Sequence, residues 1–201
     1  VALHAQLTAP RQARHKAAAL AIEAAEPTRL DELAGMLAHH WSEAGEALRA
    51  ATWYVRAARW VRNSDLTASQ RNWESARKLL LPLPVSNERA QLLLEIYPEL
   101  INLMDRLGGT PVASDSLFQE GVDFARNAGD RRTESLLEAA YAWWNTGKND
   151  WPMAIKHAER AIALSDGESH RPVQLYARFI LGRAQLWQGN TQKSLNVLDQ
   201  A

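Results

Sequence analysis

The stretch between residues 181 and 201 constrains the fold more than any other part of the chain. It places a large–small pair, a turn glycine and a small–large–small series at fixed intervals, namely Leu181-Gly182, then Gly189, then Ser194, Leu198 and Ala201. Gly182 lets two helices approach closely, and Gly189 suits a chain reversal because glycine adopts positive φ at no steric cost. The spacing predicts two helices packed antiparallel across a tight turn.

The rest of the chain also has a helical pattern. Of its 201 residues, 46% are hydrophobic, and these recur at intervals of three and four, whereas β-branched residues do not alternate. We expect Pro98 to kink or break its helix, because proline removes a backbone hydrogen bond. The predicted helices span about 10–25, 28–44, 46–62, 66–81, 86–107, 114–128, 132–146, 151–165, 172–188 and 190 onward.

The intervals within this last pair of helices are similar to those of tetratricopeptide repeats, although Gln185 replaces the consensus tyrosine. Ala125, Ala161 and Ala201 end successive second helices at separations of 36 and 40 residues, near the usual period of about 34. We expect the turn at residues 147–152 to carry two to four inserted residues. The predicted fold is all-α: a right-handed α-solenoid of four to five tetratricopeptide-like hairpins.

The composition argues against several kinds of partner and binding site. Lys and Arg number 23, and so do Asp and Glu, so no basic surface favours nucleic acid or an acidic membrane. The chain has no cysteine, which excludes disulfides and thiolate metal sites and is typical of a reducing cytoplasm. No apolar run of about 18 residues is present, so we expect no membrane span.

The pattern at both ends of the sequence is that expected of a truncated chain. It begins at Val1 without a signal-peptide pattern, and it ends at Ala201 inside a helical pattern. We therefore expect a fragment of a longer polypeptide. An apolar helix face left open at the carboxyl end would then favour a homodimer.

A second resemblance lies between about residues 10 and 100. Its most specific part is Leu37-Ala38-His39-His40-Trp41 followed by Ala44-Gly45 and an Ala-rich helix with Trp and Tyr, within residues 33–62. This resembles the start of the repeat region in bacterial signalling proteins with an AAA or STAND-type ATPase, often fused to a class III adenylate/guanylate cyclase. The segment 11–17 resembles the last helix of the module that joins ATPase to repeats.

The resemblance implies that residues 1–27 end a linker to an upstream ATPase module and that 28–201 form the repeat array. ATP and magnesium would bind upstream, and this chain would hold no cofactor. It implies a non-catalytic interaction or regulatory module whose partners are a protein or peptide and the upstream ATPase or cyclase. The alternatives are an oligomerisation scaffold without a ligand and the repeat region of an ATPase-type transcriptional regulator.

By repeat resemblance, five positions of each first helix line a concave binding surface. In the last repeat these are Tyr176, Phe179, Arg183, Leu186 and Trp187, and in the one before they are Glu134, Leu137, Tyr141, Trp144 and Asn145. Aromatic side chains with one arginine and one asparagine suit an extended peptide or an acidic terminus. The alternative is that these aromatics cover further repeats.

Other candidate sites have plainer interpretations. His39 and His40 are adjacent on a helix and point about 100° apart, so one would pack and the other would face solvent rather than both bind one metal ion. Arg56, Arg59 and Arg62 share one helix side, which suits a phosphate or, more simply, a solvated face. The sequence contains no nucleophile elbow and no glycine-rich phosphate loop, so it indicates no particular enzymatic reaction.

Overall fold

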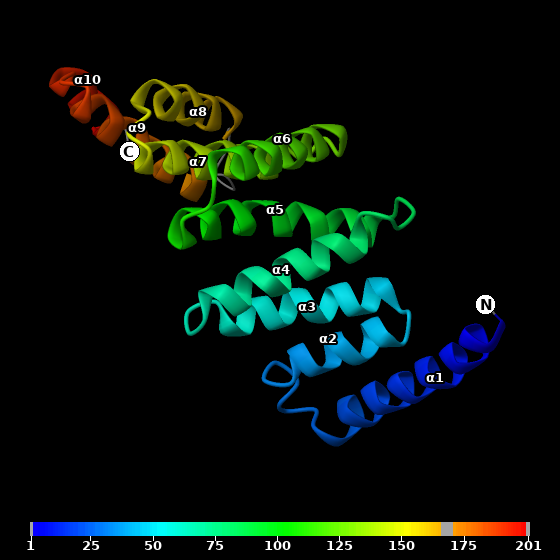
Figure 1. The fold of residues 1–201 in the computed structure, drawn as a ribbon. Helices are drawn as coiled ribbons and strands as arrows, with labels where there is room; N and C mark the ends of the chain where they lie inside the picture. Colours follow the sequence, from blue (N-terminus) through cyan, green and yellow to red (C-terminus); the bar gives the residue numbers. More distant parts are fainter. Residues whose placement is uncertain (1, 166–170, 200–201) are drawn as a thin grey trace. The chain divides into compact units, whose positions relative to one another are not determined.

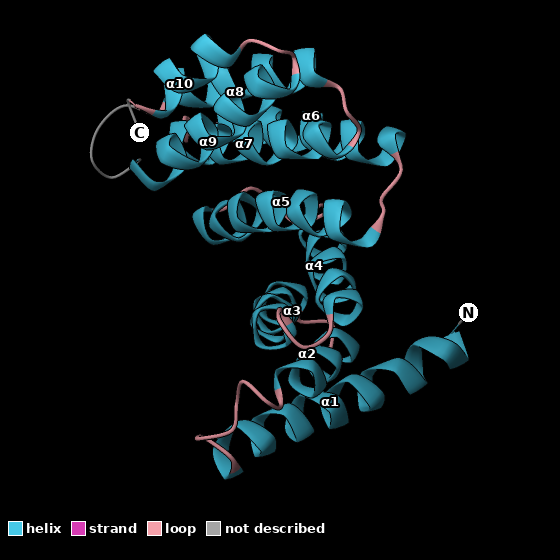
Figure 2. Ribbon diagram, turned by 90° about the vertical axis from the view of Figure 1, so that its left-hand side faces the viewer, coloured by secondary structure: helices cyan, strands magenta, loops and turns pink. Residues whose placement is uncertain are grey.

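The computed structural model describes residues 2–165 and 171–199, and these form helices joined by short loops, with no strand (Figures 1 and 2). Most helices that follow one another in sequence pack side by side. The prediction of an all-α fold built from helical hairpins is therefore confirmed. Val1 and Ala201, at the two ends, lie outside the described residues.

The chain divides into two compact units, Val1–Ile96 and Tyr97–Ala201, and the division falls within one helix. In the first unit, Ala19, Leu37, Trp41 and Ala50 form a fully buried cluster. Helix α1 packs on α2 inside this unit, and the expected linker boundary at residue 27 stays a prediction. The helices are α1 (Ala2–Ala25), α2 (Ala34–Glu43), α3 (Ala47–Val61), α4 (Leu66–Leu80) and α5 (Asn87–Leu107), the last shared with the second unit.

The second unit is held by small side chains. Two buried clusters join α7, α8 and α9: one contains Ala139, Ala161, Val173 and Ala177, and the other contains Ala142, Ala158, Ile180 and Leu181. Alanines at these positions let helix backbones approach closely, so each helix pair packs on the next. The remaining helices are α6 (Pro111–Asn127), α7 (Arg131–Gly147), α8 (Trp151–Leu164), α9 (Arg171–Trp187) and α10 (Thr191–Leu198).

The even-numbered helices α4, α6, α8 and α10 begin alike. Asp65, Thr110 and Asp150 each accept a hydrogen bond from the backbone N–H three residues later, which satisfies one of the free donors at a helix start. The residue four positions after each of these three caps, and after Asn190 before α10, is small and buried. These residues are Ser69, Ser114, Ala154 and Ser194, at intervals of 45, 40 and 40. The repeat is therefore built from α3–α4, α5–α6, α7–α8 and α9–α10.

This alignment corrects the predicted period. Counted from the helix starts, Gly121 and not Ala125 corresponds to Ala161, which gives 40 residues rather than 36. The expected insertion at residues 147–152 is also wrong, because α7–α8 and α9–α10 are each joined by three residues. Asn149 (φ 59°) and Gly189 (φ 80°) take the same left-handed conformation at the same place.

The starts of α1 and α2 differ from the prediction. Helix α1 passes through Pro10, which was expected near its start, and α2 begins at Ala34 rather than at residue 28. Residues 26–33 form turns instead, in which Arg29 pairs with both Glu26 and Glu32.

The expected break at Pro98 is wrong, because α5 runs without interruption from Asn87 to Leu107. Proline removes a single backbone donor, and Pro98 itself is buried. Packing of the side chains nearest to it offsets that loss; its buried neighbours are Leu93, Ile96, Tyr97, Leu100 and Ile101.

A substitution at Gly121 tests how closely α5 and α6 pack. A Cβ at this position would lie 3.0 Å from Cβ and Cγ of the buried Tyr97, which has no room to move away. We expect Gly121→Ala to lower the free energy of unfolding by about 1–3 kcal/mol, as overpacking of a core does.

Gly35→Ala is the matched control, because Gly35 is also helical and its added Cβ would meet only Ala57 Cβ at 4.0 Å. It should be neutral or stabilising, since alanine is the better helix former. Urea unfolding of both variants measures the difference, and equal midpoints would contradict the packing described.

Candidate functional site

Large apolar side chains of α9 are exposed along one face. Tyr176 is 39% exposed, Phe179 50%, Leu186 52% and Trp187 65%. Their spacing, with Arg183 between them, places all five on the same side of the helix. These are the residues that the sequence predicted for the last repeat.

Trp143 of α7 extends this surface, and we call Trp143 together with the five α9 residues the α9 face. The half-buried Trp143 ring lies 6.2 Å from the Tyr176 ring and 6.5 Å from the Phe179 ring, between ring centroids. The Arg183 guanidinium carbon lies 4.9 Å from the Trp143 ring centroid. At the other end, Trp187 stacks on Trp151 of α8 at 5.9 Å.

Asp105 of α5 borders Trp143. Its Oδ2 accepts a hydrogen bond of 2.8 Å from the Trp143 indole Nε1. Burial raises the pKa of the Tyr176 phenol to about 12, and the negative charge of Asp105 adds to this effect. Side chains from α5, α7 and α9 thus meet at one place, as first helices of successive repeats do.

The five residues predicted on α7 do not join this surface. Glu134, Tyr141 and Trp144 are each 6% exposed and Asn145 is 1% exposed, and Leu137 is fully buried. Aligned on Asn149 and Gly189, the α7 counterpart of Arg183 is Trp143, so the predicted positions were two residues out of register. The assumed insertion in the turn caused this error, and an alignment of the two turns without it would have found Trp143.

Glu134 and Glu138 instead anchor α7 between its neighbours. Glu134 Oε1 accepts hydrogen bonds from Arg126 of α6 at 2.8 Å and Arg160 of α8 at 3.0 Å. Burial raises the pKa of Glu134, but these two guanidinium groups outweigh it, so the pKa lies below its usual value. Glu138 Oε2 lies 2.6 Å from Nδ1 of His157. The predicted binding role of Glu134 is thus replaced by a packing role.

The His157 imidazole is enclosed by aromatic rings. It stands edge to face against Tyr141 at 4.8 Å and Phe118 at 5.2 Å, and these two rings stack on each other at 4.0 Å. The Tyr141 hydroxyl donates to Asp115, and burial is the main cause that raises its pKa. The residues around His157 therefore form the packed interior of the second unit.

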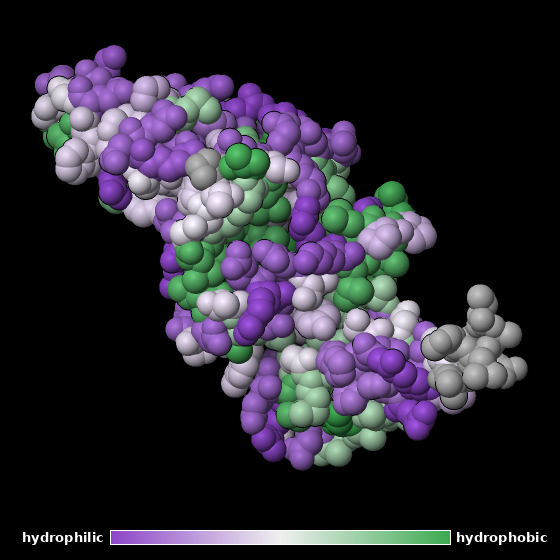
Figure 3. All heavy atoms as spheres, viewed as in Figure 1, coloured by the Kyte–Doolittle hydropathy of each residue, from purple (hydrophilic) through white to green (hydrophobic). Residues whose placement is uncertain are grey.

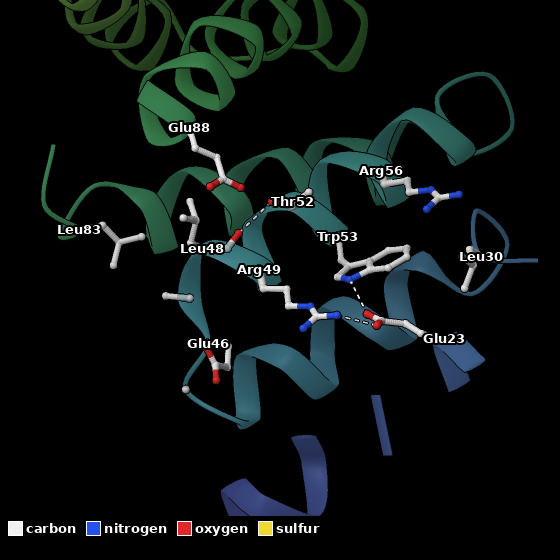
Figure 4. Close-up of a pocket in the computed structure, with 12 residues that line it drawn as sticks. Glu23, Leu30, Glu46, Leu48, Arg49, Thr52, Trp53, Arg56, Leu83 and Glu88 are labelled. Atoms are coloured by element: carbon white, nitrogen blue, oxygen red, sulfur yellow. Dashed lines mark hydrogen bonds and ion pairs between the residues drawn. The ribbon is translucent and has the colours of Figure 1, made fainter. Parts of the chain in front are cut away.

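A separate cleft of about 730 Å³ lies in the first unit, which is a volume typical of ligand sites (Figure 4). No sequence pattern predicts it, because its walls come from α1, α3, the start of α5 and the loops before α2, α3 and α5. It is lined by Glu23, Leu30, Gly45, Glu46, Ala47, Leu48, Arg49, Thr52, Trp53, Arg56, Leu83 and Glu88.

Glu23 organises one wall of this cleft. Its Oε1 accepts a hydrogen bond of 3.1 Å from the Trp53 indole, and its Oε2 lies 2.6 Å from Nη2 of Arg49 (Figure 4). Oε1 also accepts a hydrogen bond of 2.9 Å from the indole of Trp41. Arg49 also covers the Trp41 ring at 3.7 Å. These polar groups satisfy one another, so the wall is an internal network.

The arginine side of α3 is neutralised in the same way. Arg56 pairs with Asp31, and Arg59 forms a two-pronged pair with Glu95. Arg56 also lies over Trp53, 4.9 Å from its ring centroid. Because acids from neighbouring elements occupy these guanidinium groups, the arginines join helices rather than present a phosphate site.

The histidines form a cluster between α1 and α2. Nδ1 of His15 lies 3.0 Å from Nδ1 of His40, and the His39 ring is 5.7 Å from that of His40. His40 is half-buried and His39 is exposed, as the sequence predicted. No set of three metal-ligating side chains with suitable geometry occurs among the described residues.

On the view in Figure 3, apolar and polar side chains are interspersed. Within residues 2–165 and 171–199, no helix combines the length and apolar character needed to cross a membrane. A scan against protein-family models finds no match, and no curated protein sequence matches the chain.

Glu23 tests the cleft network. In Glu23→Ala, the indole N–H of the fully buried Trp41 loses its acceptor, so we expect about 1–3 kcal/mol of destabilisation in urea unfolding. Glu32→Ala is the control, because Glu32 is exposed and pairs only with Arg29, and it should change stability by less than about 0.5 kcal/mol. Equal effects would show that Glu23 is no anchor.

We expect His40 to make the stability of the folded chain depend on pH. Burial lowers its pKa from the usual value, and the charges of protonated His15 and His39 lower it further. The folded state therefore binds fewer protons, and stability should fall as pH drops below about 6.5. The nearby Lys16–Glu46 pair keeps its charges in this window, because the hydrogen bond from Lys16 holds the pKa of the Glu46 carboxyl below its usual value.

Urea midpoints at about pH 7.5 and 5.5 measure this effect. His40→Gln should reduce the difference between the two midpoints, because glutamine does not titrate. A difference that stays unchanged in His40→Gln would place the pH dependence elsewhere.

Proposed function

We propose that this chain is a non-catalytic helical-repeat module that binds an extended segment of a partner protein on the α9 face. The observation that carries the proposal is the row of four large apolar side chains of α9, each at least 39% exposed. Aromatic residues beside an arginine are the residue types that dominate binding energy at protein interfaces.

Two features support this surface over the cleft in the first unit. Arg49 and Arg56 in the cleft are already paired with acids, whereas Arg183 has no carboxylate within ion-pair distance among the described residues. The aromatic side chains of the α9 face also contact one another, so part of their ordering cost is met before a partner binds.

We extend the proposal to the larger protein. The module would serve a cytoplasmic bacterial signalling ATPase, as the sequence resemblance implies, with ATP and magnesium in upstream domains and an adenylate or guanylate cyclase as the attached catalyst. A partner on the α9 face would then act by changing how the helical pairs pack.

A second candidate is an oligomerisation scaffold, and exposed leucines favour it. Leu195 and Leu198 of α10 are 51% and 42% exposed, on the helix that follows the α9 face. Sedimentation velocity over a hundredfold concentration range distinguishes the two candidates. A scaffold assembles with concentration and loses this in Leu195→Glu, whereas a peptide-binding module needs no assembly.

The double variant Phe179→Ala/Trp187→Ala tests the proposal. Panning a random dodecapeptide phage library on the native chain should enrich peptides that bind it. Because both substituted side chains are at least 50% exposed, the variant should keep its helicity and lose binding at least about tenfold, as loss of interface aromatics does.

Trp60→Ala is the matched control, because Trp60 is 58% exposed but lies on α3. It should bind the enriched peptides as the native chain does. Failure to enrich any peptide, or peptides insensitive to the double variant, would rule out the α9 face.

A further inference from the structure

The charges that border Trp143 are of opposite sign. Asp105 approaches through the indole, with its Oδ2 at 2.8 Å from Nε1, and Arg183 approaches the ring face, with its guanidinium carbon 4.9 Å from the centroid. The two side chains come from different helices, α5 and α9, and they do not form an ion pair with each other. An aromatic platform thus has an acidic border and a basic border.

Neither Asp105 nor Arg183 has a partner of opposite charge among the described residues. Arg183 is half-buried and has the Trp143 ring as its contact, but no carboxylate partner among the described residues. Asp105 is also half-buried, and within the described parts of the chain it pairs only with the indole, so its second oxygen can accept a further hydrogen bond. In the first unit, by contrast, Arg49, Arg56 and Arg59 each face an acid.

The position of Asp105 depends on the absence of a side chain opposite it. A Cβ built on Gly147 would lie 3.1 Å from Asp105 Oδ1, which is closer than ordinary contact. Gly147 thus leaves Asp105 room at the end of α7, next to Trp143. The acidic border is therefore a packed feature of α5 and α7 and not a freely moving surface acid.

We propose that this platform binds a peptide carrying a basic and an acidic side chain on either side of an apolar one, with the basic group at Asp105 and the acidic group at Arg183. The inference rests on the proposed peptide-binding function and adds its charge order. The apolar side chain lies against Trp143, Tyr176 and Phe179. Because the two borders differ in sign, the bound peptide has one direction.

Three fluorescein-labelled hexapeptides test this order. They share the core Gly-Leu-Phe-Gly and carry Lys before and Glu after it, Glu before and Lys after it, or Gln at both positions. Fluorescence anisotropy with the whole chain should show one charged order binding about tenfold more tightly than the other, with the Gln peptide between them. Raising the salt concentration should shrink the difference, because exposed charges are screened.

The charge-swapped variant Asp105→Lys/Arg183→Glu should reverse the preference between the two charged peptides. Arg183→Glu alone removes the preference without touching the Trp143 hydrogen bond, so it keeps the test valid if the double variant fails to fold. Arg106→Glu is the control, because Arg106 is an exposed neighbour of Asp105, and it should leave the order unchanged.

The outcomes separate the two proposals. Equal binding of all three peptides, lost in Phe179→Ala/Trp187→Ala, would overturn the charge order and leave the binding function standing. A preference that persists in Arg183→Glu would also overturn it. No binding by any of the three at millimolar concentration would count against both.

Discussion

Close packing of α9 against α7 and α8 through small side chains is the interaction on which the second unit depends. Ala139, Ala142, Ala158, Ala161 and Ala177 stand where the three helices meet, and all are at least 96% buried. Such positions let backbones approach so closely that larger residues flanking the contact are displaced outward. Trp143 and Phe179 lie beside each other for this reason. The surface is thus a consequence of the packing, and the repeat period fixes which side chains reach it.

The sequence allowed the last repeat to be predicted and not the one before it, and the reason is the chemistry of the turn. Gly189 signals a left-handed residue directly, whereas Asn149 takes the same conformation without a glycine to mark it. The prediction therefore placed the α7 turn wrongly and selected Glu134, Tyr141, Trp144 and Asn145, which are buried. Tertiary packing likewise kept α5 continuous through Pro98, a residue whose local preference opposes it. The cleft around Glu23 depends on contacts between distant segments, which no local pattern contains.

Most arginines of the two units pair with acidic side chains, and Arg183 differs from them in a way that bears on binding. In the first unit, guanidinium groups close onto Glu23, Asp31 and Glu95 and lie against tryptophan rings, so their charge serves to join helices. In the second, Arg126 and Arg160 do the same for the buried carboxylate of Glu134. Arg183 departs from this pattern, because it lies on a ring and no described residue places a carboxylate within ion-pair distance of it. An unmatched charge that is half-buried costs desolvation, and a partner that supplies the opposite charge recovers it.

The central claim is that partners bind the α9 face, and indole signals of the tryptophans test it most directly. The chain has eight tryptophans, so a ¹⁵N-tryptophan-labelled sample gives eight side-chain N–H resonances, each assignable by a Trp→Phe variant. Titration with a peptide enriched on the native chain should shift the resonances of Trp143, Trp151 and Trp187. The resonances of Trp41, Trp53, Trp60 and Trp73 in the first unit should stay in place. Shifts confined to Trp41 and Trp53 would place the binding site in the cleft and contradict this account.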